Sequence, residues 1–123
     1  MAKSLQPELA ILLKQTSRTF HKTLIVLPSA IRFQISLAYL LARTTDTIAD
    51  TEIVPMEQRL RALHQLRERI LGERDTSLDF TTLANQQGDP AERQLLEKCD
   101  RSLAELRELS SDDLQRVREV LKT

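Results

Sequence analysis

Four polar residues fall on one face of a largely apolar helical segment, residues 30–51. Tyr39, Arg43, Asp46 and Asp50 follow one another at intervals of four, three and four residues, which is the spacing of neighbours on one side of an α-helix. Two carboxylates one turn apart repel each other, and a divalent cation removes that repulsion. Mg²⁺ suits such a pair because it takes oxygen ligands and commonly bridges to phosphates. The pattern therefore indicates a metal-assisted diphosphate site, in which the two aspartates hold the metal.

An ordinary solvated surface explains the same spacing. Arg43 could pair with Asp46 or Asp50 as a surface ion pair worth under about 1 kcal/mol. Asp75 and Asp79 also stand four residues apart, but no apolar helical segment surrounds them. Spacing alone therefore leaves both interpretations open for the first pair, and we discount the second pair.

A second candidate is the hydroxyl-rich run from Thr16 to Phe20. Ser17, Arg18 and Thr19 stand near a helix break, where side-chain and backbone donors could bind an oxyanion. Ser17 as a plain helix cap is the competing interpretation. Phe20 and Tyr39 either line a cavity or fill the core.

Helices must position these residues, because apolar residues recur at helical spacing nearly throughout the chain. Glycine occurs twice, proline four times, and aromatic residues make up 3% of the 123 residues, so we expect an all-α fold of about five or six helices. Ser29 is the expected N-cap of the long helix. Pro55 is expected to open the next helix, which Gly72 ends as a left-handed C-cap.

The remaining elements follow from the same spacing. The helix after Pro55 is expected to bury Met56, Leu60, Leu63, Leu66 and Ile70 and to turn Arg59, Arg61, Arg67 and Arg69 outward. Residues 73–89 read as a connection. Asp89 and Pro90 begin a helix with Glu92 at the third position, and its buried side carries Leu95, Leu96, Cys99, Leu103 and Leu106. Ser110 and its acidic neighbours cap a last helix through Leu121.

Charge and composition limit the classes of function and the location that this chain can have. Eighteen basic residues balance 18 acidic ones, which argues against a nucleic-acid binder. The first 45 residues are nevertheless basic and could receive an anionic ligand, although a solvated face explains them equally. Arg32 and Gln34 interrupt the least polar stretch, so we expect no transmembrane segment. A single cysteine favours a reducing, cytoplasmic location, and peripheral membrane contact stays open.

Taken together, these motifs resemble the squalene and phytoene synthase family, the head-to-head prenyl synthases. The order, spacing and residue types of three runs carry the resemblance: Thr16-Ser17-Arg18-Thr19-Phe20, Leu27-Pro28, and Tyr39-Leu40-Leu41-Ala42-Arg43-Thr44-Thr45-Asp46-Thr47-Ile48-Ala49-Asp50. The resemblance covers the whole chain, although its specific motifs lie in the first 50 residues.

The resemblance implies an isoprenoid synthase fold that joins two farnesyl or geranylgeranyl diphosphates. By the same resemblance Asp46 and Asp50 bind Mg²⁺, and Arg43 contacts diphosphate together with Ser17, Arg18 and Thr19. Phe20 and Tyr39 would line the cavity beside the carbocation, where dry apolar walls prevent quenching by water. In squalene-forming relatives, Arg18 and Arg43 would instead serve the phosphate of NADPH.

Two departures from the family pattern bear on activity. Ala49 stands where relatives often carry a third acid, and the second aspartate-rich motif of the family has no counterpart in these residues. The last helix also runs to residue 123 without a stop signal. We therefore expect residues 1–123 to be the N-terminal portion of one isoprenoid synthase domain, inactive and prone to self-association when alone.

The residues leave three functions open. The motif from Asp46 to Asp50 resembles squalene synthases slightly more than plant-type phytoene synthases, so condensation of two farnesyl diphosphates is the leading hypothesis. A phytoene- or dehydrosqualene-type synthase is one alternative. A non-catalytic helical interaction module, whose apolar faces bury against a partner, is the other.

Overall fold

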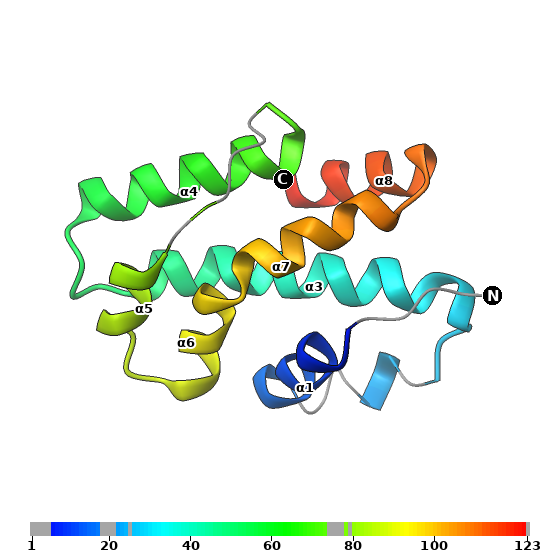
Figure 1. Ribbon diagram of the computed structural model, residues 1–123, viewed down its shortest axis with the longest axis horizontal. Helices are drawn as coiled ribbons and strands as arrows, with labels where there is room; N and C mark the ends of the chain where they lie inside the picture. Colours follow the sequence, from blue (N-terminus) through cyan, green and yellow to red (C-terminus); the bar gives the residue numbers. More distant parts are fainter. Residues whose placement is uncertain (1–5, 18–21, 25, 74–77, 79, 123) are drawn as a thin grey trace.

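The computed structural model describes residues 6–17, 22–24, 26–73, 78 and 80–122. Every regular element within these ranges is a helix, which confirms the all-α expectation (Figure 1). The helices are α1 (Pro7–Thr16), α3 (Ser29–Asp50), α4 (Met56–Leu71), α5 (Thr81–Gln86), α6 (Pro90–Glu97), α7 (Cys99–Ala104), a 3₁₀ turn (Glu105–Glu108) and α8 (Ser111–Lys122).

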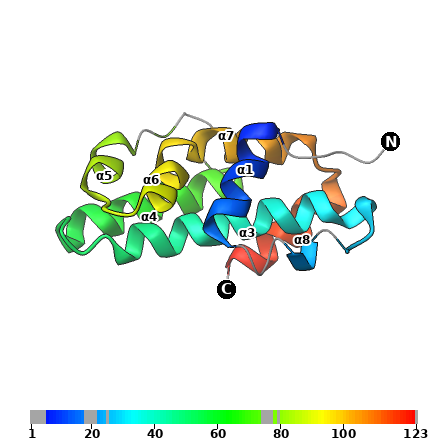
Figure 2. The same ribbon diagram turned by 90° about the horizontal axis from the view of Figure 1, so that it is seen from below.

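The long helix α3 is the centre of the fold. In Figure 1, α4 lies along its C-terminal half and α8 along its N-terminal half, and α3 also contacts α6 and α7. Figure 2 shows α1 on the same side of α3 as α6, which α1 contacts. No helix in the described ranges has the length and apolarity needed to cross a bilayer.

Two hydrophobic clusters hold these helices together. The larger cluster joins α3 to α4, α5, α7 and α8 through residues that include Leu37, Leu41, Leu66 and Leu103. The smaller one joins α1 to α3 and α6 through Leu9, Leu12, Leu13, Leu24, Leu40 and Leu95. Burial of this apolar surface is the main force that fixes α3 in place.

The start of α3 differs from the sequence expectation by one residue. Ser29 is the first helical residue, and Pro28 is the N-cap with no side-chain cap hydrogen bond. The reason is that the Pro28 carbonyl already accepts from the amides of Ile31 and Arg32, at 3.1 and 3.2 Å. At the other end, the helix closes at Thr51, which is the C-cap.

The buried line of α4 also differs from the expectation. Ala62, Leu66 and Ile70, four residues apart, face the core, whereas Met56 and Leu60 are 64% and 57% exposed. Both had been expected to be buried, but they lie off this line because each residue turns the helix by about 100°. Pro55 is the N-cap of α4 rather than its first residue.

Gly72 ends α4 in the left-handed conformation that the sequence predicts, with φ 80° and ψ 10°. A Cβ at this position would lie 2.8 Å from Nη2 of Arg118, whose Nε donates to the carbonyl of Ile70. We expect Gly72→Ala to lower the free energy of unfolding by about 1–2 kcal/mol, measured by urea denaturation. Gly88→Ala is the control, because a Cβ there meets no atom within 4 Å; an equal loss in both variants would contradict the explanation.

The segment 73–89 is not a plain connection, as its low apolar content had suggested. It contains the short helix α5, whose Leu83 and Ala84 are buried together with the preceding Phe80. The helix that follows Asp89 is also divided, because Lys98 departs from helical geometry between α6 and α7. Its expected buried side is nonetheless confirmed, from Leu95 to Leu106.

Cys99 lies in the larger cluster, 1% exposed. Burial, and secondarily the charge of Asp100, raises the pKa of its thiol from 9.0 to about 12. Between these pH values the unfolded thiol loses its proton and the folded thiol keeps it, so the free energy of unfolding falls as pH rises, by up to about 1.4 kcal/mol per pH unit. The free energy of unfolding is measured with urea from pH 8 to 11 for the native chain and for Cys99→Ala. The difference between the two should fall with this slope, and an equal pH dependence in both chains would contradict the explanation.

Candidate functional site

Asp46 and Asp50 lie exposed on the last two turns of α3. The helix has no basic residue in its last turn, so both carboxylates stand at the negative end of the helix dipole, each at a cost of about 0.3–1 kcal/mol. Their i,i+4 spacing adds mutual repulsion of a few tenths of a kcal/mol. This arrangement lowers the stability of the helix, and a bound cation would offset both terms.

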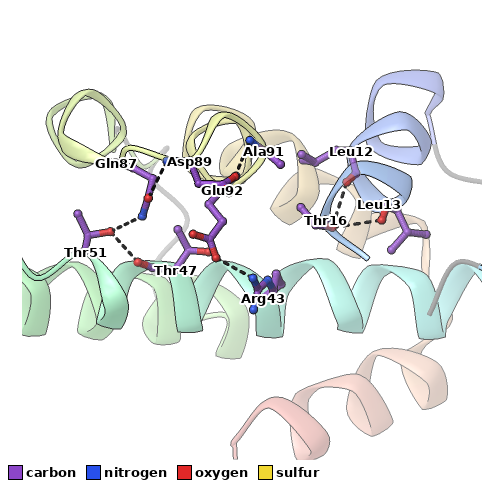
Figure 3. A network of polar contacts seen from close by, with 10 residues as sticks. All are labelled: Leu12, Leu13, Thr16, Arg43, Thr47, Thr51, Gln87, Asp89, Ala91 and Glu92. Atoms are coloured by element: carbon purple, nitrogen blue, oxygen red, sulfur yellow. Dashed lines mark hydrogen bonds and ion pairs between the residues drawn. The ribbon is translucent and has the colours of Figure 1, made fainter. Parts of the chain in front are cut away.

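Hydroxyl groups tie the aspartate-bearing end of α3 to its own backbone. Thr44 and Thr45 donate to the carbonyls four residues earlier at 2.7 and 3.1 Å. Thr51 donates in the same way to the carbonyl of Thr47 at 2.7 Å, and its oxygen accepts from Nε2 of Gln87 at 2.9 Å (Figure 3). Gln87, from the α5–α6 connection, therefore helps to fix the end of the helix.

Arg59 supplies the positive charge that the end of α3 lacks. Its Nη1 donates to the carbonyl of Ala49 at 2.6 Å, and its Nε donates to the carbonyl of Val54 at 3.0 Å. Arg59 was expected to face outward, and the structure corrects this expectation. A signal was present, because Arg59 stands three and seven residues before Ala62 and Leu66 and so falls on the α3-facing line of α4.

Arg43 pairs with Glu92 of α6, and Nη2 lies 2.7 Å from Oε1 (Figure 3). The side chains are 35% and 20% exposed. The expected partner of Arg43 was Asp46 or Asp50. Glu92 was expected only to help begin a helix. Glu92 is thus a residue of the site that sequence reasoning missed, because it is 49 residues away along the chain.

The other candidate residues are described only in part. Tyr39 is half-buried and packs against the smaller cluster, as Leu27 and Ile35 also do. Ser17 is the C-cap of α1, and its amide donates to the carbonyl of Leu13 at 3.1 Å. Arg18, Thr19 and Phe20 lie outside the described residues.

The donor set suits a metal that takes part of its coordination from a ligand. Among the described residues, no group of three or more His, Cys, Asp and Glu side chains could enclose an ion. A pair of exposed carboxylates with open sides fits Mg²⁺, which usually keeps waters and binds through one or two carboxylates plus substrate phosphates. Asp46 and Asp50 are the residues that would hold it.

An apolar groove of about 230 Å³ lies farther along α3. It is formed with α8 and lined by Ile31, Gln34, Ile35, Ala38, Asp113, Arg116, Val117 and Val120. Ile35 precedes Asp46 by eleven residues, close to three helical turns, so both start from the same face of α3, about 16 Å apart. One helix face thus carries a pair of carboxylates at one end and apolar surface at the other.

Comparison with known proteins identifies one family. The family model described as squalene/phytoene synthase matches residues 13–122. No curated protein and no solved structure matches the chain significantly.

Proposed function

Because the chain belongs to the squalene/phytoene synthase family, we propose that it serves the head-to-head condensation of two farnesyl diphosphates, as in squalene synthases. Membership assigns it to the prenyltransferase-type enzymes of isoprenoid biosynthesis, which act on prenyl diphosphates. The farnesyl substrate, the squalene-type product and the dependence on Mg²⁺ are the parts that we add.

The observation that carries the proposal is the exposed carboxylate pair at the end of α3. The helix dipole and the mutual repulsion of Asp46 and Asp50 both oppose two acids at this end of α3, although the guanidinium of Arg59 at the carbonyl of Ala49 lessens the cost. Bound Mg²⁺ would supply neutralisation of the charge that grows on the departing diphosphate. Arg43, one turn earlier, would contribute hydrogen bonds to diphosphate oxygens.

The choice of a squalene-type product depends on the residues between the aspartates. Thr47 follows Asp46 directly, whereas phytoene-type relatives often have an acid there. A squalene-type product also requires a hydride, for which NADPH would be the donor. A phytoene- or dehydrosqualene-type product remains the alternative that the experiment below separates.

Turnover needs more acids than this pair. Since no group of three or more His, Cys, Asp and Glu side chains among the described residues could hold a metal, ligands from another segment or another chain would have to face α3 across the substrate. We therefore expect the 123 residues alone to bind prenyl diphosphates without steady release of inorganic diphosphate. Steady release from farnesyl diphosphate by the purified chain would refute this expectation.

Thermal unfolding with non-reactive substrate analogues tests the proposal. The chain is heated with inorganic diphosphate, farnesyl thiodiphosphate or geranylgeranyl thiodiphosphate, each in Mg²⁺ or in EDTA. We expect stabilisation only in Mg²⁺. The farnesyl compound should stabilise more than inorganic diphosphate because its chain adds apolar contacts, and more than the geranylgeranyl compound if the cavity is shaped for the farnesyl chain of a squalene-type reaction. Stabilisation that persists in EDTA would overturn the metal role, and preference for the geranylgeranyl compound would overturn the squalene-type assignment.

Exposed apolar side chains support a second candidate, a helical interaction module. Val26, Ile53 and Val120 are 77%, 73% and 65% exposed, and such surface favours association with a partner or a second copy. Sedimentation over a hundredfold concentration range separates the two functions. Self-association that is indifferent to Mg²⁺ and diphosphate would favour the module.

A further inference from the structure

The ion pair between Arg43 and Glu92 is an incomplete one. A guanidinium commonly pairs with a carboxylate through two parallel hydrogen bonds, but here one contact joins Nη2 to Oε1 at 2.7 Å. The Nε of Arg43 is buried and has no hydrogen-bond partner in the structure. A buried donor without an acceptor is costly, so the guanidinium has more to gain from a ligand that offers several oxygens.

Glu92 is free for this contact because other groups cap its helix. In a capping box, the glutamate at the third position of a helix accepts from the N-cap amide. Here the amide of Asp89 donates to Oε1 of Gln87 at 3.1 Å. The Asp89 carboxylate in turn accepts from the amides of Ala91 and Glu92 at 2.9 and 3.0 Å (Figure 3). The first turn of α6 is therefore capped without the Glu92 side chain, which reaches α3 instead.

We propose that Glu92 competes with the diphosphate for Arg43. Glu92 holds the guanidinium on the α6 side in the free protein, and the ligand draws it away by offering a bidentate set of oxygens beside Asp46. Glu92 is thus a positioning residue that acts through Arg43 and sets how tightly the anion binds. The inference rests on the proposed function in one respect, namely that Arg43 contacts diphosphate.

The sign of the effect distinguishes this role from a structural one. If Glu92 merely supported the fold, its removal would weaken or leave unchanged the binding of diphosphate. If it competes, Glu92→Gln keeps the shape and an acceptor oxygen but removes the charge, so anion affinity should rise about two- to tenfold. Inorganic diphosphate in Mg²⁺ is the probe, and isothermal titration calorimetry with the 123-residue chain measures its affinity.

Two controls complete the experiment. Glu97→Gln removes the same charge from the same helix, where the carboxylate faces Arg93 at 3.7 Å on the surface, and should leave the affinity unchanged. In the Arg43→Gln background, Glu92→Gln should no longer raise the affinity. An unchanged or lower affinity in Glu92→Gln, or a rise that survives loss of Arg43, would overturn the inference. Absence of any binding by the native chain would instead point to failure of the proposed function.

A spectroscopic measurement tests the exchange of partners directly. With ¹³C-labelled glutamate and ¹⁵N-labelled arginine, saturating diphosphate should shift both the Glu92 carboxyl carbon and the Arg43 Nε–H resonance. The Glu92 signal should move because its partner leaves. A shifted Arg43 signal with a static Glu92 signal would mean that the pair persists in the complex, which contradicts competition.

Discussion

Replacing Asp46 and Asp50 together with asparagine should abolish the Mg²⁺-dependent binding of diphosphate, with at least a tenfold loss of affinity. The amides keep the size of the side chains but cannot hold a hard divalent cation in the same way. Without ligand, the free energy of unfolding of the same double variant should be about 0.5–1.5 kcal/mol higher, because two charges leave the negative end of α3. Calorimetry and urea denaturation measure the two effects.

The opposite signs of these effects make the test specific. A substitution that damages the fold lowers both quantities, whereas removal of a metal site raises stability while binding is lost. Asp112→Asn is the control, because this exposed acid lies in the first turn of α8, where a negative charge is favourable. Asp112→Asn should lower the free energy of unfolding by a few tenths of a kcal/mol and leave the binding of diphosphate intact. Undiminished binding of diphosphate by the double variant would contradict the proposed metal site.

Leu41→Ala should lower the free energy of unfolding by about 2–5 kcal/mol. Leu41 is 0% exposed and belongs to the larger cluster, on the side of α3 opposite Arg43. Truncation removes buried methyl groups and leaves a cavity that the neighbouring helices fill only in part. In a chain of this size the melting temperature should fall by about 8–20 °C.

A leucine on the surface provides the comparison for this prediction. Leu60→Ala makes the same chemical change at a side chain that is 57% exposed, and it should cost less than about 0.5 kcal/mol. Leu41→Met, which nearly conserves volume, should cost less than about 1.5 kcal/mol. Equal losses at positions 41 and 60 would mean that α3 is not the centre of the core.

The sequence predicted the elements whose signals are local. The apolar periodicity of residues 30–51 gave α3 to within one residue at each end, and the polar face with Asp46 and Asp50 follows from helical spacing alone. The left-handed Gly72 and the N-cap Asp89 were also predictable, because each depends on a few neighbouring residues.

The remaining features depend on how the helices pack. The exposure of Met56 and Leu60 could not be predicted, because the rotation of α4 is set by its contact with α3. Glu92 followed a capping pattern that the structure does not use, and its partner lies on another helix. Arg59 was assigned to solvent by its charge, although its hydrogen bonds are with the carbonyls that end α3.

The separation of Arg43 from Glu92 along the chain has a consequence for biosynthesis. The two aspartates reach their final spacing as soon as α3 forms, whereas the guanidinium acquires its partner only after another 49 residues have been made. At about 5–20 residues per second, a ribosome needs roughly 2–10 s for that stretch. A nascent chain therefore passes through a period in which the acids are ready for magnesium while the neighbouring cation is still unrestrained.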